Sequence, residues 1–135
     1  MAKPTIYTRV FSRNSPRQLV SGKGPKGKAT RLHALITRAY GKCIRCGNTH
    51  ALQCAHIISR KYAWTRTDLD NAFCLCASCH MYFTDNPVEF GQFTIDQIGD
   101  ENYTALLRKR QSTSKVDWDV EAKRLEEIAR ERGLM

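Results

Sequence analysis

Acidic residues are missing from the first half of this chain. Residues 1–67 contain no aspartate or glutamate, although they hold fourteen lysines and arginines. Residues 68–135 hold eight basic and thirteen acidic residues. The first half therefore has a charge of +14 and the second half a charge of −5, which give the net charge of +9. A one-sided basic field attracts polyanions, above all nucleic acid. An uneven charge on an ordinary surface is the weaker alternative, because so long an acid-free run rarely arises by accident.

Long hydrophobic runs are missing as well. No run approaches the ~20 apolar residues that a membrane-spanning helix needs, and no hydrophobic segment typical of a signal peptide follows the N-terminus. We therefore expect a cytoplasmic protein. Six cysteines in a chain without an export signal favour metal binding over disulfides. The length of 135 residues corresponds to one domain, whose small core would gain stability from a bound metal.

Residues 1–29 are predicted to form a basic N-terminal arm. Three prolines and three glycines interrupt any long helix in this segment. Both a disordered tail and an arm that becomes ordered along DNA phosphates fit this composition. The residues expected to contact DNA are Lys3, Arg9, Arg13, Arg17, Lys23, Lys26, Lys28 and, just beyond the arm, Arg31.

Hydrophobic periodicity predicts a core over residues 30–86 and C-terminal helices over 87–135. A polar loop over 60–70 separates the two expected strands. The acidic residues of the last helix are expected to lie on a solvent-exposed face. The predicted elements are a helix at 30–40, strands at 51–59 and 71–75, and helices at 77–83, 87–98, 102–110 and 117–132.

Four other residues belong to no clear motif. Tyr62 and Trp64 in the polar loop either stack on nucleic-acid bases or pack over the strands. His33 in the first helix and His50 in a loop are expected to be ordinary surface residues.

The cysteines form two matched Cys-x-x-Cys pairs. Zinc prefers soft ligands in a tetrahedron, and each pair supplies two. We therefore expect a structural zinc ion held by Cys43, Cys46, Cys76 and Cys79, with no open position for chemistry. Cys54 and Cys74 are expected to be buried residues of the strands rather than ligands.

Between and after these pairs stand His56, Asn71 and His80. The motifs Cys-x-x-Cys-Gly, Ala-His-Ile-Ile-Ser-Arg, Leu-Asp-Asn and Leu-Cys-x-x-Cys-His follow one another over about residues 40–85. In this order they resemble the HNH endonuclease family. The resemblance implies an α+β fold, with a ββα-metal hairpin and helix stapled by zinc. The stretch after it resembles, more loosely, the phage NinG or Rap recombination nucleases, which implies a phage origin and a host cytoplasmic location.

The resemblance also implies a role for each residue. His56 would be the general base, Asn71 would hold the loop and orient His56, His80 would bind the catalytic ion, and Arg60 would bind the scissile phosphate. The chain departs from much of the family at Ala55, where an acidic or histidine ligand is usual. The expected ion is Mg²⁺ or Mn²⁺, with Ni²⁺ or Zn²⁺ as further candidates.

Together these features predict a DNA endonuclease acting on duplex or branched DNA and leaving 5′-phosphate and 3′-hydroxyl ends. A dimer is compatible with the sequence. Ala55 favours an alternative, a catalytically inactive, zinc-stabilised DNA-binding module. A third interpretation is a recombination partner whose acidic last helix docks another protein.

Overall fold

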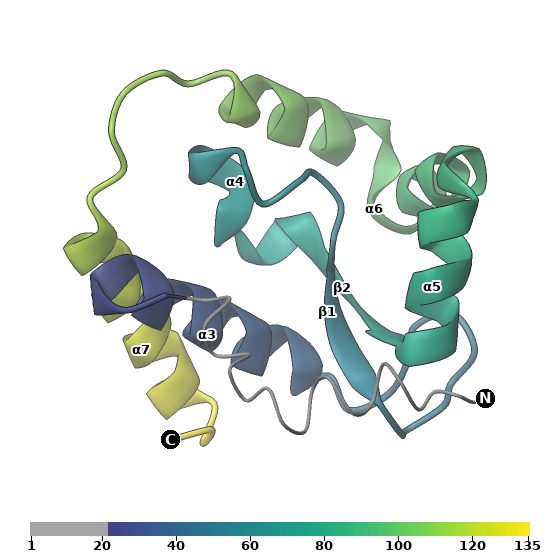
Figure 1. Cartoon of the computed structure of the whole chain (residues 1–135), viewed down its shortest axis with the longest axis horizontal. Helices are drawn as coiled ribbons and strands as arrows, with labels where there is room; N and C mark the ends of the chain where they lie inside the picture. The colour runs from purple at the N-terminus through teal and green to yellow at the C-terminus, as the bar shows by residue number, and fades with distance from the viewer. Residues whose placement is uncertain (1–21) are drawn as a thin grey trace.

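The computed structural model describes residues 22–135, so Lys3, Arg9, Arg13 and Arg17 of the predicted arm lie outside the described residues. Helices surround a two-stranded hairpin, with α3 and α7 side by side at one end and α5 with the first half of α6 at the other (Figure 1). The elements are α3 (Gly24–Arg38), β1 (Leu52–His56), α4 (Ala63–Arg66), the 3-10 turn η1 (Leu69–Asn71), β2 (Ala72–Cys76), α5 (Ala77–Asp85), α6 (Pro87–Arg110) and α7 (Trp118–Glu131).

The hairpin and the helix after it form one ββα unit. β1 and β2 pair antiparallel, with Cys54 opposite Cys74 and His56 opposite Ala72. α5 begins immediately after β2, with Cys76 as its N-cap residue. This arrangement confirms the predicted α+β fold, although each strand is five residues long and β1 is therefore shorter than expected.

The two faces of β1 look in opposite directions, because side chains alternate along a strand. Cys54 and His56 face α3, where they lie beside its His33. Gln53 and Ala55 face α5. The hairpin thus separates the side chains beside α3, which include His56, from those beside α5, which include Gln53 and Ala55.

The α5 side of the hairpin is a hydrophobic core closed by the first half of α6. The rings of Phe73 and Phe93 meet edge to face, with centroids 5.5 Å apart. Phe83 lies 5.0 Å from Phe90 between ring centroids, and such aromatic contacts stabilise a small core beyond the area they bury. The buried members are Cys43, Ala55, Phe73, Leu75, Cys76, Cys79 and Phe83.

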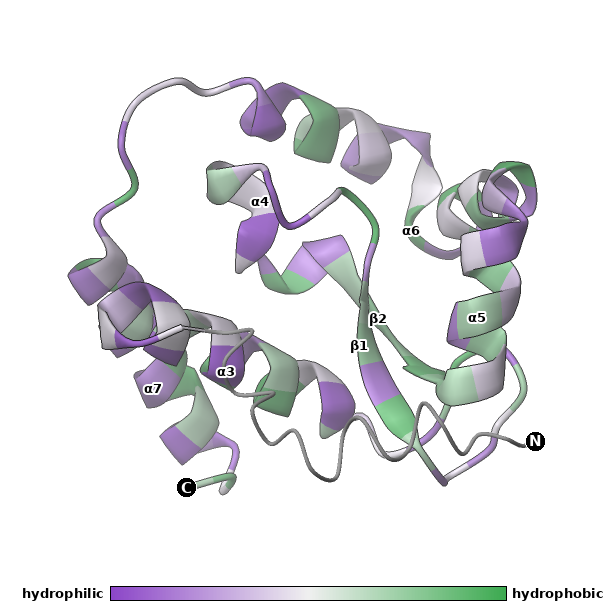
Figure 2. Cartoon of the chain, in the orientation of Figure 1, coloured by the Kyte–Doolittle hydropathy of each residue, from purple (hydrophilic) through white to green (hydrophobic). Residues whose placement is uncertain are grey.

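A second core joins α3 to α7. Figure 2 shows hydrophilic and hydrophobic bands alternating along α7, as expected for a helix with one buried face. Asp117 caps this helix by accepting hydrogen bonds from the backbone amides of Asp119 and Val120. The buried residues of this core are Ala29, Leu32, Ile36, Ala122, Leu125 and Ala129.

α3 begins at Gly24, six residues earlier than the sequence predicted. Pro25 lies in the first turn, where its missing N–H costs no intrahelical hydrogen bond. Ala29 is fully buried against α7, so packing outweighs the low helix propensity of the nearby glycines. Residues 24–29 therefore belong to the folded domain and not to an extended arm.

The acidic face of α7 is only partly exposed, which corrects the expectation of a solvated face. Glu126 pairs with Lys28 at 3.3 Å. Glu121 accepts a hydrogen bond from Oγ1 of Thr67 at 2.7 Å and forms an ion pair with Arg124. The Lys28–Glu126 pair thus uses an acidic residue of the second half to neutralise a basic residue of the first.

A long connection carries the chain from α6 to α7. α6 bends at Gly99, whose φ of 86° is a conformation that other residues rarely adopt. The linker beyond it is fixed by Trp64, whose Nε1 donates to the carbonyl oxygen of Ser114 at 2.7 Å. Trp64 thus packs within the fold, one of the two roles left open for it. Within residues 22–135, no helix combines the length and apolar character needed to cross a membrane.

Candidate functional site

Four cysteines meet where β2 ends at Cys76 and where Cys79 lies in the first turn of α5. Together with Cys43 and Cys46, their sulfur atoms all lie within 4.8 Å of one another. Sγ of Cys46 is 3.7 Å from Sγ of Cys76, and zinc–sulfur bonds of ~2.3 Å in a tetrahedron place sulfurs about 3.8 Å apart. The group predicted from the sequence therefore fits a structural zinc ion.

The surroundings of the cluster favour a thiolate at Cys76 but not at Cys79, where burial and the neighbouring cysteines raise the pKa to about 12. Nη1 of Arg45 donates to Sγ of Cys79 at 3.4 Å, and its guanidinium lies 4.4 Å from the ring centroid of Tyr82. Burial opposes ionisation of Cys76, but hydrogen bonds with Ser78 and the neighbouring cysteines lower its pKa to about 6. Arg45 is thus the positive charge that accompanies the sulfur ligands.

On the other face of the hairpin, His56 is held in one tautomer. Its Nε2 lies 2.9 Å from the carbonyl oxygen of Arg66. Because a carbonyl only accepts, Nε2 carries the hydrogen and Nδ1 carries the lone pair. Burial is the main cause that lowers the pKa of His56 to about 4, so the ring is neutral at pH 7 and can accept a proton.

His33 lies next to His56 and is fully buried, so its assignment to the surface was wrong. The two ring centroids are 5.0 Å apart. Nε2 of His33 donates to the carbonyl oxygen of Asp68 at 2.8 Å, and its Nδ1 is 3.7 Å from Sγ of Cys54. Burial lowers the pKa of His33, which keeps this imidazole neutral as well.

The sequence did contain a signal for this burial. Ala29, Leu32, His33 and Ile36 follow the i, i+3, i+4, i+7 spacing of one helix face. Cys54 is half-buried rather than a closed core residue, whereas Cys74 is buried as predicted.

Asn71 is fully buried and clamps the chain on both sides of the loop. Its Oδ1 accepts from the backbone N–H of Ile58 at 2.8 Å. Its Nδ2 donates to the carbonyl oxygens of Ile58 at 3.1 Å and Thr65 at 2.9 Å. These bonds position the segment after His56 and the residue before Arg66, whose carbonyl fixes the His56 ring.

Two arginines stand at the edge of this cluster. Arg66 donates from Nε to Oγ1 of Thr30 at 3.0 Å and from Nη1 to the carbonyl oxygen of Arg60 at 3.2 Å. Arg60 itself is exposed. Their charges add to the effect of burial in lowering the pKa of His56, so a phosphate near His56 would meet positive charge.

His80 lies in a different environment from His56. Its Nδ1 is 2.7 Å from Oε1 of Gln53, on the α5 face of β1. Burial lowers its pKa, so the imidazole is neutral and able to bind a metal. Ala55 lies on the same face, is 1 % exposed, and offers no ligand. The structure thus brings His56 together with His33 and Cys54, and leaves His80 outside that group.

Of the basic residues expected to contact DNA, four lie among the described residues. Lys28 pairs with Glu126, and Nζ of Lys26 lies 5.7 Å from the ring centroid of Trp118. Nη1 of Arg31 donates to the carbonyl oxygen of Gly22 at 2.9 Å, and Lys23 is exposed.

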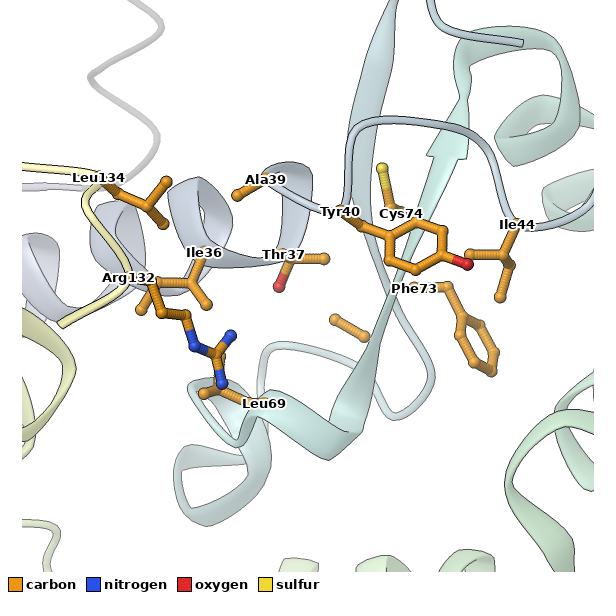
Figure 3. Close-up of a pocket in the computed structure, with 11 residues that line it drawn as sticks. Ile36, Thr37, Ala39, Tyr40, Ile44, Leu69, Phe73, Cys74, Arg132 and Leu134 are labelled. Atoms are coloured by element: carbon orange, nitrogen blue, oxygen red, sulfur yellow. The ribbon is translucent and has the colours of Figure 1, made fainter. Parts of the chain in front are cut away.

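A pocket of about 390 Å³ opens between α3, β2 and the C-terminal end of the chain (Figure 3). Tyr40 and Ile44 lie at one side of it and Arg132 and Leu134 at the other. Its lining includes Cys74 but none of the predicted catalytic residues within the described chain. This pocket is therefore separate from the His56 cluster.

Comparison with known families identifies the central part of the chain. Residues 36–95, which include the hairpin and α5, match the family model described as HNH endonuclease. No curated protein and no solved structure gave a significant match to the chain. The looser likeness to the NinG and Rap nucleases gained no support from these comparisons.

Proposed function

We propose that this chain is a metal-dependent DNA endonuclease with His56 as its general base. The observation that carries the proposal is the fixed tautomer of His56. Its Nε2–H is engaged by the carbonyl of Arg66, so Nδ1 is the proton acceptor. The HNH match over residues 36–95 makes a nuclease the general expectation, and the geometry of His56 supports hydrolysis by an activated water.

In the proposed reaction, Nδ1 of His56 takes a proton from the attacking water. Asn71 acts as a positioning residue, because its bonds to Ile58 and Thr65 hold both segments that orient the ring. Arg60 binds the scissile phosphate through its exposed guanidinium. Cleavage leaves 5′-phosphate and 3′-hydroxyl ends.

The catalytic ion would be held through His80. A divalent ion bound there would supply the positive charge that stabilises the phosphate and the leaving oxygen. His80 offers one imidazole nitrogen, and Ala55 offers no second ligand from the strand. Such a site fits a weakly held ion completed by water and phosphate, with Mg²⁺ or Mn²⁺ favoured and Ni²⁺ or Zn²⁺ as further candidates.

DNA is the favoured substrate because of the charge distribution. The acid-free first 67 residues attract a polyanion, while the Lys28–Glu126 ion pair neutralises one of their charges within the domain. Arg60 and the basic residues before α3 contribute to the remaining positive charge. A role in phage recombination, repair or DNA processing completes the proposal; it rests only on the loose resemblance of the segment after residue 85, which the comparisons did not support.

A cleavage screen tests the proposal. The purified chain is incubated with supercoiled, linear, nicked, branched and single-stranded DNA, in Mg²⁺ or Mn²⁺ and with EDTA as the control. We expect metal-dependent cleavage of duplex or branched DNA, with ends that DNA ligase can rejoin. Absence of cleavage with every metal and DNA form would contradict the proposal.

An inactive DNA-binding module is the second candidate, and Ala55 favours it. Ala55 packs in the hydrophobic core with Phe73 and Phe83, so this position of the strand is committed to packing. The module would bind DNA with the strong salt dependence of phosphate contacts and cleave none of the DNA forms in the screen. The same samples, assayed for binding and for cleavage, separate the two candidates.

A further inference from the structure

We propose that His33, Cys54 and His56 form a second metal site, separate from the four-cysteine cluster, which binds a borderline-soft divalent ion such as Zn²⁺ or Co²⁺. One ligand atom from each of the three residues lies within 4.8 Å of the other two. The residues come from α3 and from the α3-facing side of β1. Two imidazoles and one thiol are ligands that these ions favour.

The distances are close to those of a bound ion. Zinc–nitrogen bonds of ~2.0 Å and zinc–sulfur bonds of ~2.3 Å in a tetrahedron place nitrogen and sulfur about 3.5 Å apart. Nδ1 of His33 lies 3.7 Å from Sγ of Cys54. Binding would therefore require only a small adjustment of these side chains.

Both histidines are already oriented for metal binding through Nδ1. Nε2 of His33 donates to the carbonyl of Asp68 at 2.8 Å, and Nε2 of His56 donates to the carbonyl of Arg66 at 2.9 Å. Metal-binding histidines usually donate their second N–H to a carbonyl or carboxylate, which fixes the ring and its tautomer. Here the same arrangement exists twice, on adjacent rings 5.0 Å apart.

Charged groups surround the three ligands, and the thiol of Cys54 must lose its proton when an ion binds. Asp68, Glu121 and Arg124 are the charged groups that act on His33. Arg38 and Arg60 act on Cys54, and Arg60 and Arg66 act on His56. Burial raises the pKa of Cys54, so the thiol is protonated without a metal, and binding would release that proton to the solvent.

Three protein ligands leave one position of a tetrahedron open, as in catalytic zinc sites. Cys54 and His56 are half-buried, so a water or a small anion can reach that position. The site stands on geometry that is independent of the proposed nuclease activity. It nevertheless uses Nδ1 of His56, so an ion there and proton transfer to His56 exclude each other.

Cobalt titration tests the site without an activity assay. The chain is first loaded with one equivalent of Zn²⁺, which fills the tighter four-cysteine cluster, and then titrated with Co²⁺. We expect a second equivalent to bind with a thiolate-to-cobalt absorption band. Cys54→Ser should abolish the band and retain the first equivalent of zinc, which shows that the variant is folded. His50→Ala, at an exposed histidine outside both clusters, should behave as wild type.

Two results would contradict the second metal site. No second equivalent in the wild type, or an absorption band that persists in Cys54→Ser, would overturn the second site. His33→Ala provides an independent variant, in which the second equivalent should be lost while the four-cysteine cluster still holds zinc. If the chain cleaves DNA but binds no second equivalent of Co²⁺, the proposed function holds and the second metal site is wrong. If it binds the second equivalent but does not cleave DNA, the metal site holds and the proposed function is wrong.

Discussion

The side-chain amide of Asn71 donates to the carbonyl oxygen of Thr65 at 2.9 Å, and this bond ties the loop that carries Arg66 to the start of β2. With the two bonds to Ile58, it uses both polar atoms of a fully buried side chain. Asn71 is therefore a structural clamp as much as a residue of the candidate active site.

We expect Asn71→Ala to lower the free energy of unfolding by about 3 kcal/mol, because it leaves buried backbone groups without partners. Urea denaturation monitored by circular dichroism measures the change. Asn102→Ala is a suitable control, since the Asn102 side chain donates to the Ile98 carbonyl at an exposed position, and a change of under ~0.5 kcal/mol is expected. Equal effects of the two substitutions would contradict the clamp.

The sequence predicts those features of the structure that depend on residues close together in the chain. The Cys-x-x-Cys pairs and the strands between them have short-range patterns, and these patterns predicted the hairpin, α5 and the four-cysteine cluster. The helix spacing around His33 indicates its burial, but its hydrogen-bond partner Asp68 lies 35 residues away, and Ser114, the partner of Trp64, lies 50 residues away. No local pattern contains such pairings, so these two partners could not be predicted.

The start of α3 at Gly24 was also not predictable from the local sequence. Gly24, Pro25 and Gly27 have poor intrinsic helix propensity, which favoured an extended arm. Burial of Ala29 and its neighbours against α7 supplies the stability that the local sequence lacks. Helix packing with a segment nearly a hundred residues later overrides propensity here.

Replacing one ligand of the four-cysteine cluster should remove its zinc. Cys46→Ser is informative because Cys46 is exposed, so the substitution creates no cavity. We expect well under one equivalent of zinc in the cluster and a lower melting temperature, since metal-binding energy contributes to folding. Elemental analysis and thermal denaturation measure both effects. Wild-type zinc content and stability in this variant would argue against a structural zinc.

Removal of residues 1–21 should weaken DNA binding without unfolding the domain. The deletion ends before α3, and it removes the basic residues Lys3, Arg9, Arg13 and Arg17. Each lost phosphate contact should flatten the plot of log affinity against log salt by about 0.9 for duplex DNA. Fluorescence anisotropy at several salt concentrations measures the slope. If affinity and slope both stay unchanged, the segment makes no phosphate contacts.

The pairing of Glu121 with Thr67 and Arg124 predicts a defined response to acid. Burial alone would raise the pKa of Glu121, but hydrogen bonds from Arg124 and Thr67 overcome this effect and lower it. The folded state therefore binds fewer protons than the unfolded state in this range, and stability is lost as pH falls below ~4.3 towards the folded-state pKa.

We expect Glu121→Gln to be less stable than wild type at pH 7 and the difference to shrink at acid pH, once the wild-type carboxylate is protonated. Urea denaturation over a pH series measures the difference. Glu127→Gln, at an exposed position of the same helix, is the matched control. A difference between Glu121→Gln and wild type that is independent of pH would show that the carboxylate charge contributes nothing.

Excess Zn²⁺ should inhibit cleavage, because an ion in the second metal site binds Nδ1 of His56. Cys54→Ser should weaken this inhibition, because one of three ligands is lost. Initial rates at fixed Mn²⁺ and increasing Zn²⁺ give the inhibition constant, with His50→Ala as the control. Identical inhibition of wild type and Cys54→Ser would place the inhibitory zinc elsewhere.

The role of His56 as general base is decided by the initial rate of nicking of supercoiled plasmid in saturating Mn²⁺, compared between wild type and His56→Ala. His50→Ala controls for the loss of an imidazole, and DNA affinity and circular dichroism confirm that each variant binds and folds. We predict a rate on the order of 10²–10⁴ lower for His56→Ala and an unchanged rate for His50→Ala. Equal rates for wild type and His56→Ala would contradict a base at this position.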